Sequence, residues 1–439
     1  MNIIKKLSII TILLATIFTG LIIATFCIPT SAVQKNVEQS AMQIQHDGVW
    51  YKPLGCFLFQ IDNLTDCQML RINATADSNR PVWAAMMAEQ YDNTIDTINS
   101  YNNVVVCTKH IAHTGRTNSD IYSNYARYWH GYQVLLRPLL TLFSYHTILV
   151  INYVSLLFII LSVILATYRI VGNVFALTLT LSLALTNIFI VPFALQFSTC
   201  YYIFLLAMAL FIIKPEYTRR RKDLCIYIFF IIGAITSYMD FLTTPVLTLG
   251  MPLVTLIAIN EKKNHSKQLP PSTNTRRHQQ APIKTIIYNS MAWGAGYAIL
   301  WILKWCIGSL LTKTNIFDSA MHNAKLRVGN TLIFNGKEIP LSDFIHLILN
   351  KVYAIINPWL IILIFVAIIV LVALYVYKHW EQTKQHYWLL IIAMMPVAWF
   401  IVMKNHSIQH IFFTWRDFLL TVWCLTAYLC LTIRKPKAI

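Results

Sequence analysis

Two aspartates, Asp62 and Asp66, stand four residues apart in a polar stretch near the N-terminus. A carboxylate placed there could act as a general base and take a proton from an acceptor hydroxyl. Two simpler interpretations remain open. Both residues could be solvated loop residues, and Asp62 with Asn63 could form a turn or a helix cap. The chemical interpretation predicts Asp62 as the base and Asp66 as its alternative.

Other polar residues far along the chain could serve the same chemistry. Lys304 and Arg416 are cations that could bind a phosphate, Arg416 through two parallel hydrogen bonds. Each has an alternative as a lipid anchor that reaches the headgroup layer. The other candidates for binding a substrate or a lipid phosphate are Tyr128, His130, Arg137, Gln196, Asp240, His406 and His410.

The pair His406 and His410 has the i, i+4 spacing of metal ligands on a helix, but the sequence offers no third ligand nearby. A divalent metal therefore has no support beyond this spacing, and no cofactor is predicted. Phosphate-binding glycine loops and paired CxxC motifs are also missing from the sequence. An ATP-driven pump on this chain is therefore not expected.

The composition places these residues in a membrane protein. Of 439 residues, 57% are hydrophobic and 12% are charged, and the mean hydropathy is +0.56. The charged fraction is about half that of a typical soluble protein. The net charge of +17 comes from short basic clusters between apolar runs. Such clusters mark cytoplasmic loops, so the charge indicates membrane topology rather than a nucleic-acid partner.

The apolar runs predict an all-α polytopic fold with about ten transmembrane helices. The second span follows Pro138 and ends near 167. The other expected spans are 7–28, 171–191, 193–213, 224–239, 245–260, 286–311, 352–377, 387–403 and 418–433. This arrangement predicts a multi-pass cell-membrane protein with both termini in the cytoplasm. It also places Arg219, Arg220 and Arg221 inside and every candidate functional residue on the extracytoplasmic side.

Three parts follow from this topology. Residues 1–28 form an anchor, 29–146 form an extracytoplasmic loop with interfacial helices, and 147–439 form the multispan domain. That domain contains a cytoplasmic linker at 261–284 and a second outer loop at 312–351, with a turn expected at Phe334–Lys337. The sequence leaves open whether Cys56 and Cys67 in the first loop are bridged.

Several short strings along this architecture look like those of a known class. They are Asp62-Asn-x-Thr-Asp66, Tyr128-Trp-His-Gly131, Leu136-Arg-Pro-Leu139, Lys304-Trp305, Asn405-His-Ser-x-x-His410 and Phe413-Thr-x-Arg416. With the long outer loop after the first span, the chain resembles the GT-C membrane glycosyltransferases. That class typically places an essential acid in its first outer loop, which by position implies Asp62 or Asp66. Glu38 and Asp47 lie closer to the first span.

The resemblance implies transfer of a sugar from a polyprenyl-phosphate carrier to an envelope acceptor at the outer membrane face. The implied partners are the lipid-linked sugar, the bilayer, and an acceptor glycan, glycolipid or protein. Three alternatives remain open. They are a transporter or flippase for a lipid-linked glycan, a polysaccharide polymerase or ligase, and a membrane scaffold without enzymatic activity.

Overall fold

The protein is seen here in a computed structural model. It describes residues 3–48, 51, 61–91, 122–215, 222–240, 242–266, 275–334, 337–343, 345–346, 370, 374–375, 377–378 and 384–433. Within these ranges the fold is almost entirely helical. The only strands form two antiparallel pairs, β1 (Gln90–Tyr91) with β2 (Tyr122–Ser123) and β3 (Thr331–Phe334) with β4 (Lys337–Pro340).

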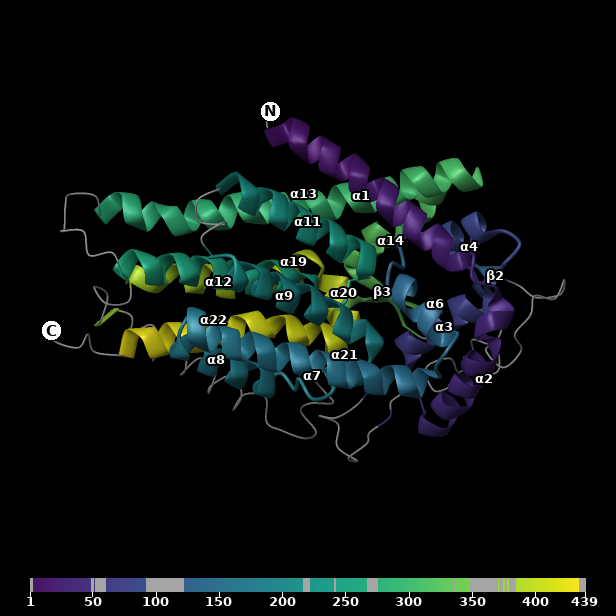
Figure 1. Ribbon diagram of the computed structural model, residues 1–439, viewed down its shortest axis with the longest axis horizontal. Coiled ribbons are helices and arrows are strands. Elements are labelled where there is room, and N and C mark those ends of the chain that lie inside the picture. Colours follow the sequence, from purple (N-terminus) through teal and green to yellow (C-terminus); the bar gives the residue numbers. More distant parts are fainter. Residues whose placement is uncertain are drawn as a thin grey trace.

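Ten helices of the described residues lie roughly side by side and form a bundle, and most of them are long (Figure 1). They are α1 (Ile3–Phe26), α7 (Tyr145–Ile170), α8 (Asn173–Leu185), α9 (Leu195–Ile213), α11 (Lys222–Met239), α12 (Pro245–Ser266), α13 (Thr275–Thr312), α18 (Tyr387–Ala393), α19 (Met395–Val402) and α22 (Phe418–Ile433). Five stretches in the described residues are long and apolar enough to cross a membrane, and two shorter helices are also apolar. The all-α fold is thus confirmed and is consistent with a membrane protein, while the count of ten spans remains a prediction. Most of the expected span 352–377 lies outside the described residues.

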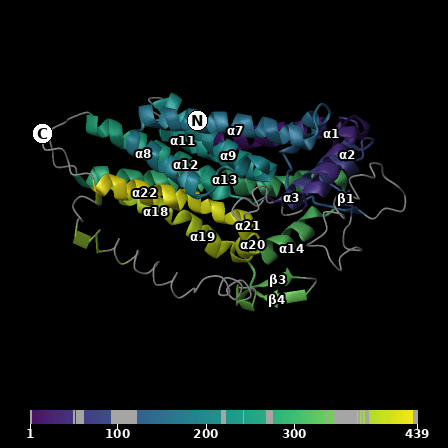
Figure 2. The ribbon, with the colours of Figure 1, turned by 90° about the horizontal axis from the view of Figure 1, so that it is seen from below.

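Shorter elements cover one end of the bundle, on the right in Figure 1, which we call the capped end. They are α2 (Thr30–Asp47), α3 (Asn63–Thr75), α4 (Pro81–Met87), α6 (Gln133–Leu140), η3 (Val191–Phe193), α14 (Ile316–Val328), α20 (Lys404–Gln409), α21 (Ile411–Thr414) and η5 (Trp415–Asp417), together with the two strand pairs. Figure 2 shows α14, α20 and the β3–β4 hairpin next to one another at this end. At the opposite end, η4 (Lys384–His386) leads into α18.

Glycines allow α11 and α13 to pack at very close range. A Cβ added at Gly233 would lie 2.0 Å from the carbonyl oxygen of Trp293, and one at Gly296 would lie 2.0 Å from that of Phe230. Only a residue without a side chain fits such an approach, and this kind of packing is common between membrane helices. The contact holds α13 against the bundle and fixes the position of Lys304.

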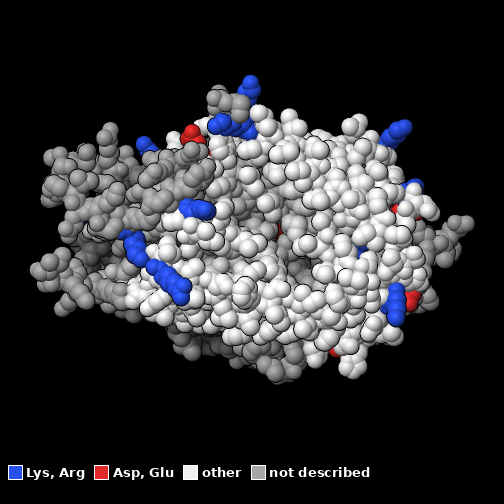
Figure 3. All heavy atoms as spheres, in the orientation of Figure 1, with Lys and Arg blue, Asp and Glu red and all other residues white. Residues whose placement is uncertain are grey.

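The outer surface of the bundle is apolar. Large side chains such as Ile12, Phe158 and Leu177 are 69%, 71% and 67% exposed, respectively. The middle of the face in Figure 3 is almost free of charged side chains, and Lys and Arg lie mostly toward its two ends. An apolar surface this extensive would be unfavourable in water and fits a lipid environment.

Prolines explain where the helices depart from the sequence-based expectation. The expected span 387–403 is interrupted at Met394, and α19 begins again with Pro396 in its first turn, where a missing N–H is tolerated. Pro138 lies inside α6, and the following long helix begins only at Tyr145. The expected turn at Phe334–Lys337 is confirmed, because these two residues pair across the β3–β4 hairpin.

Candidate functional site

Asp62 lies at the N-terminus of α3 and is 2% exposed. Its Oδ1 accepts a hydrogen bond from Thr65 N at 3.3 Å, and its Oδ2 accepts one from Thr65 Oγ1 at 2.7 Å. The bond to the third backbone N–H identifies Asp62 as the helix cap, so the capping interpretation is confirmed. Gln196 Nε2 also donates to Asp62 Oδ2, at 2.8 Å. The cap of α3 is therefore tied to the first turn of α9.

Asp66 is fully buried and joins three helices. Its carboxylate accepts hydrogen bonds from the Tyr145 hydroxyl at the start of α7, from Leu195 N at 2.8 Å and from Gln196 N at 3.3 Å. The last two donors are free N–H groups at the N-terminus of α9, where a negative charge is favourable. Asp66 thus fastens α3 to the beginnings of α7 and α9.

Burial raises the pKa of Asp66 to about 7, although the hydrogen bonds from Tyr145 and Leu195 oppose the shift. Because an unfolded aspartate titrates near pH 4, the folded protein binds more protons than the unfolded chain between about pH 4 and 7. Stability should therefore be greatest below pH 4 and should fall as the pH rises through 7, by on the order of 4 kcal/mol from this residue.

We expect the variant Asp66→Asn to lose much of this pH dependence. The measurement is the apparent melting temperature of the purified protein between pH 4 and 8, compared with wild type. Burial also raises the pKa of Asp240 to about 6, so Asp240 lowers the stability in the same direction as the pH rises. The informative quantity is therefore the difference between the pH dependence of wild type and that of Asp66→Asn. An unchanged slope in Asp66→Asn would show that Asp66 does not titrate in this range.

Arg416 lies in η5, close to Asp62, and is 3% exposed. Its guanidinium carbon is 4.4 Å from the ring centroid of Phe197, and Nη1 donates to Phe412 O at 3.0 Å. Burial lowers the pKa of Arg416 to about 10, while Tyr201 and Asp62 oppose the shift. The side chain therefore remains cationic at neutral pH and lies within electrostatic range of Asp62.

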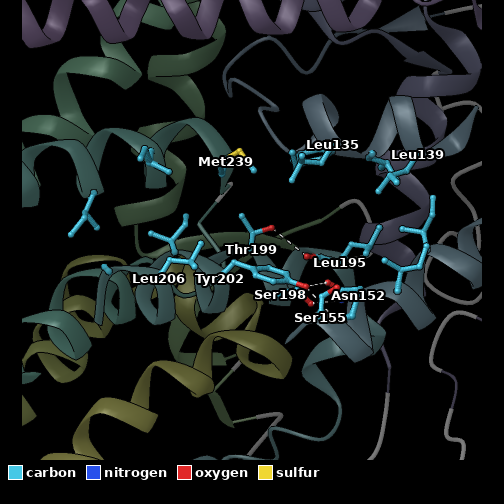
Figure 4. Close-up of a pocket in the computed structure, with 18 of the residues that line it drawn as sticks. Leu135, Leu139, Asn152, Ser155, Leu195, Ser198, Thr199, Tyr202, Leu206 and Met239 are labelled. Atoms are coloured by element: carbon cyan, nitrogen blue, oxygen red, sulfur yellow. Dashed lines mark hydrogen bonds between the residues drawn. The ribbon is translucent and has the colours of Figure 1, made fainter. Parts of the chain in front are cut away.

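A largely apolar groove of about 640 Å³ begins beside these groups and follows α9 between α6, α7 and α11. Figure 4 shows Leu135 and Leu139 of α6 near Leu195 at one end, with Leu206 further along α9. Lining residues extend from Leu195 to Leu210, which corresponds to about 22 Å along the helix. The lining suits a hydrocarbon chain.

Four consecutive residues in the first turn of α9 connect the groove to the charged residues. Leu195 and Ser198 line the groove. Between them, Gln196 binds Asp62 and Phe197 lies against Arg416. The groove and the two charged residues thus lie on different faces of the same helical turn, and a lipid in the groove would place its headgroup near that turn.

Asp240 caps the turn between α11 and α12. Its carboxylate accepts hydrogen bonds from Leu242 N at 2.9 Å and from Thr243 N at 3.0 Å, as well as from the Thr243 hydroxyl. Leu242 has a φ of 74°, in the left-handed region, so these bonds stabilise a strained turn. His406 Nε2 donates to Leu242 O at 2.8 Å, which places α20 against the same turn.

His406 and His410 are close, with ring centroids 4.8 Å apart. His410 Nε2 accepts a hydrogen bond from Arg327 Nη1 at 2.8 Å. Burial lowers the pKa of His406 to about 3 and keeps the pKa of His410 well below its usual value. Both rings are therefore neutral, and the described residues contain no group of three potential metal ligands.

Lys304 belongs to a second buried cluster. Its Nζ donates to Met86 O at 2.7 Å and lies 5.9 Å from the ring centroid of Trp129. His130 Nε2 donates to Tyr125 O at 2.9 Å, and its Nδ1 lies 2.9 Å from the Tyr132 hydroxyl. The contacts of Lys304 are thus with α4 and the 125–132 segment, and it does not contact Asp62, Asp66 or Arg416.

The 125–132 segment is buried rather than lying at the membrane surface as an interfacial helix. Trp129 is 0% exposed and donates to Leu300 O at 2.8 Å, and Tyr128 stacks on Trp301 at a centroid distance of 5.8 Å. A Cβ at Gly131 would lie 2.6 Å from Tyr238 O. The aromatic run is therefore part of the core that joins the cap to the bundle.

Four residues of the site were not candidates in the sequence. Tyr145 binds Asp66, and Arg327 binds His410. Tyr201 and Asp417 are both 0% exposed, and Tyr201 lies within electrostatic range of Arg416 and of Asp417. Asp417 follows Arg416 directly in the sequence, and the other three carry no sequence signal because tertiary contacts define them.

Cys67 in α3 forms a disulfide bond, and its partner lies outside the described residues. Cys56, whose bridge to Cys67 the sequence left open, also lies outside the described residues. Comparison with protein-family models, with curated proteins and with solved structures found no match to this chain.

Proposed function

We propose that this chain is a membrane glycosyltransferase that moves a sugar from a polyprenyl-phosphate donor to an envelope acceptor. The observation that carries the proposal is the first turn of α9, which borders an apolar groove on one face and contacts buried Asp62 and Arg416 on its other faces. The groove is longer than one leaflet, which is about 15 Å thick. A prenyl chain of several isoprene units would fit along it.

In this proposal the residues divide the reaction between them. Asp62 takes the proton of the acceptor hydroxyl as its oxygen attacks the anomeric carbon of the sugar. The bond from that carbon to the phosphate oxygen breaks, and the polyprenyl phosphate leaves with the bonding electrons. Arg416 stabilises the negative charge that develops on this phosphate. Asp66 keeps the first turn of α9 in place.

The same proposal places the capped end on the extracytoplasmic side. The disulfide of Cys67 supports this orientation, because disulfides persist in oxidising compartments. Helix α9 ends at Ile213 and α11 begins at Lys222, both at the other end of the bundle, and the sequence between them is basic. That position agrees with the rule that positive loops stay inside.

We expect a tryptophan at Leu206 to block the groove and to lower transfer by at least about tenfold, because the prenyl chain loses its binding site. The assay incubates purified protein in nanodiscs with a panel of labelled polyprenyl-phosphate sugars and an envelope extract, and follows the release of polyprenyl phosphate. Leu177→Trp is the matched control, since Leu177 is also an exposed leucine (67%, against 55% for Leu206) but lies on α8, outside the groove.

Wild type and Leu177→Trp should release polyprenyl phosphate at similar rates. Absence of release from every donor by wild type would contradict the glycosyltransferase proposal. Normal release by Leu206→Trp, with a melting temperature equal to that of wild type, would show that the groove does not hold the donor.

A further inference from the structure

Arg416 and three residues near it carry buried polar atoms that have no hydrogen-bond partner among the described residues. The atoms are Gln196 Oε1, the Tyr201 hydroxyl, Arg416 Nε and both carboxylate oxygens of Asp417, and each residue is at most 3% exposed. Such atoms are uncommon, because burying a polar atom without a partner costs about 1–3 kcal/mol. Other unpartnered atoms occur elsewhere in the bundle, but the concentration here calls for a ligand.

The four side chains belong to one region of the structure, because Gln196 precedes Phe197, whose ring centroid is 4.4 Å from the guanidinium carbon of Arg416. Gln196 binds Asp62, and Asp62 acts electrostatically on Arg416. Tyr201 lies within electrostatic range of both Arg416 and Asp417. The group therefore extends from the cap of α3, across α9, to η5.

The chemistry of the free atoms indicates which ligand they suit. Arg416 Nε–H can only donate, Gln196 Oε1 can only accept, and the Tyr201 hydroxyl can do either. A phosphate would need donors alone, and a metal ion would need acceptors alone. A mixed set of donors and acceptors matches hydroxyl groups, each of which donates one hydrogen bond and accepts others. The arrangement is therefore complementary to a sugar ring.

The charges narrow the class of sugar further. Asp417 lies near a second buried acid, Asp240, which together with burial raises the pKa of Asp417 well above its usual value. The backbone N–H of Leu247 opposes this shift but is outside hydrogen-bond geometry. Asp62 is a third buried acid of this region and lies within electrostatic range of Arg416. A negative charge is therefore already unfavourable at this place, and a uronic acid would add another, whereas the hydroxyl of a neutral sugar could form a hydrogen bond with the Asp417 carboxyl group.

We propose that Gln196, Tyr201, Arg416 and Asp417 form the subsite that binds the transferred sugar, and that this subsite accepts a neutral sugar rather than a uronic acid. This inference rests on the proposed glycosyltransferase function and names its substrate class. The four side chains are buried, so sugar binding requires the elements around them to move apart, a gating step of the kind common in enzymes.

The test uses two conservative variants with a matched control for each. Tyr201→Phe removes only the unpartnered hydroxyl, and Asp417→Asn removes the charge. Tyr227→Phe is the control for the first, because Tyr227 also has a buried, unpartnered hydroxyl but lies near the start of α11, at the other end of the bundle. Asp77→Asn is the control for the second, because Asp77 pairs with Arg80 near the surface.

For a neutral polyprenyl-phosphate hexose, we expect kcat/KM to fall about tenfold in Tyr201→Phe and at least about 100-fold in Asp417→Asn. Wild type should prefer the hexose over the matching uronic acid donor by at least about 100-fold, and Asp417→Asn should narrow this preference. Both controls should behave as wild type. Equal use of the two donors by wild type, or unchanged kcat/KM in both variants, would overturn the inference.

A binding measurement separates this inference from the proposed function. Saturation-transfer NMR on the intact protein in nanodiscs would compare methyl hexosides with methyl glucuronide. Binding of the neutral glycosides, lost in Asp417→Asn, supports the subsite even if no donor is turned over, in which case the glycosyltransferase proposal alone fails. Binding of neither sugar, or stronger binding of the glucuronide, rejects the subsite.

Discussion

Replacing Arg416 with methionine is expected to lower kcat for sugar transfer by about 10²–10³-fold, the usual effect of removing a group that stabilises charge in a transition state. The guanidinium is buried against Phe197, and the structure gives it one hydrogen bond, to Phe412 O at 3.0 Å. Its remaining donors are thus available to a departing phosphate. Methionine has a similar shape and leaves the packing on Phe197 largely in place.

The kinetic measurement separates this role from a general attraction to lipid. If Arg416 acts on the leaving group, kcat falls more than the affinity for the donor. Arg80→Met is the control, because Arg80 lies at the same end of the bundle with a side chain 54% exposed and an ion pair to Asp77. A wild-type kcat in Arg416→Met would remove Arg416 from the mechanism.

Arg137→Met is expected to destabilise the cap strongly, by on the order of 4 kcal/mol. Arg137 is 0% exposed, and its guanidinium donates to Ile28 O at 2.8 Å, Thr30 Oγ1 at 3.1 Å, and Asn73 O and Oδ1 at 3.2 Å each. The variant removes all of these hydrogen bonds from buried and half-buried acceptors. The sequence placed Arg137 among the phosphate-binding candidates, whereas its contacts favour a structural role in joining α6 to α3 and to the start of α2.

The apparent melting temperature and the yield of folded protein measure this effect, and Arg169→Met provides the control because Arg169 is exposed in the last turn of α7. Arg137→Met should melt clearly lower than wild type, while Arg169→Met should not. A normal melting temperature in Arg137→Met, combined with weaker binding of polyprenyl phosphate, would return Arg137 to the lipid-binding site.

The sequence predicted those features that depend on local pattern. The apolar runs located α1, α7, α9 and α13, because a run of about twenty apolar residues has few alternatives to a membrane helix. The position of Asp62 before a helical stretch allowed for a cap, which the structure contains. The hairpin at Phe334–Lys337 followed from its turn residues.

Features that depend on tertiary contacts could not be predicted. Asp62 and Gln196 are 134 residues apart in the chain, and Arg137 binds a carbonyl 109 residues away. Trp129 lies in a run that is typical of a membrane interface, yet it is buried because Leu300 O accepts its N–H. Lys304 is a charged residue that could pair with many partners, and only the packing of α13 against α4 selects Met86 O.

The most direct measurement is a cryo-EM structure of the protein in nanodiscs with a polyprenyl-phosphate hexose. The prenyl chain should lie along α9 from Leu195 to Leu210, with the phosphate within hydrogen-bond distance of Arg416 and the hexose between Tyr201 and Asp417. A donor whose phosphate is bound at Lys304, or a groove that contains only phospholipid while the donor binds elsewhere, would contradict the site described for this chain.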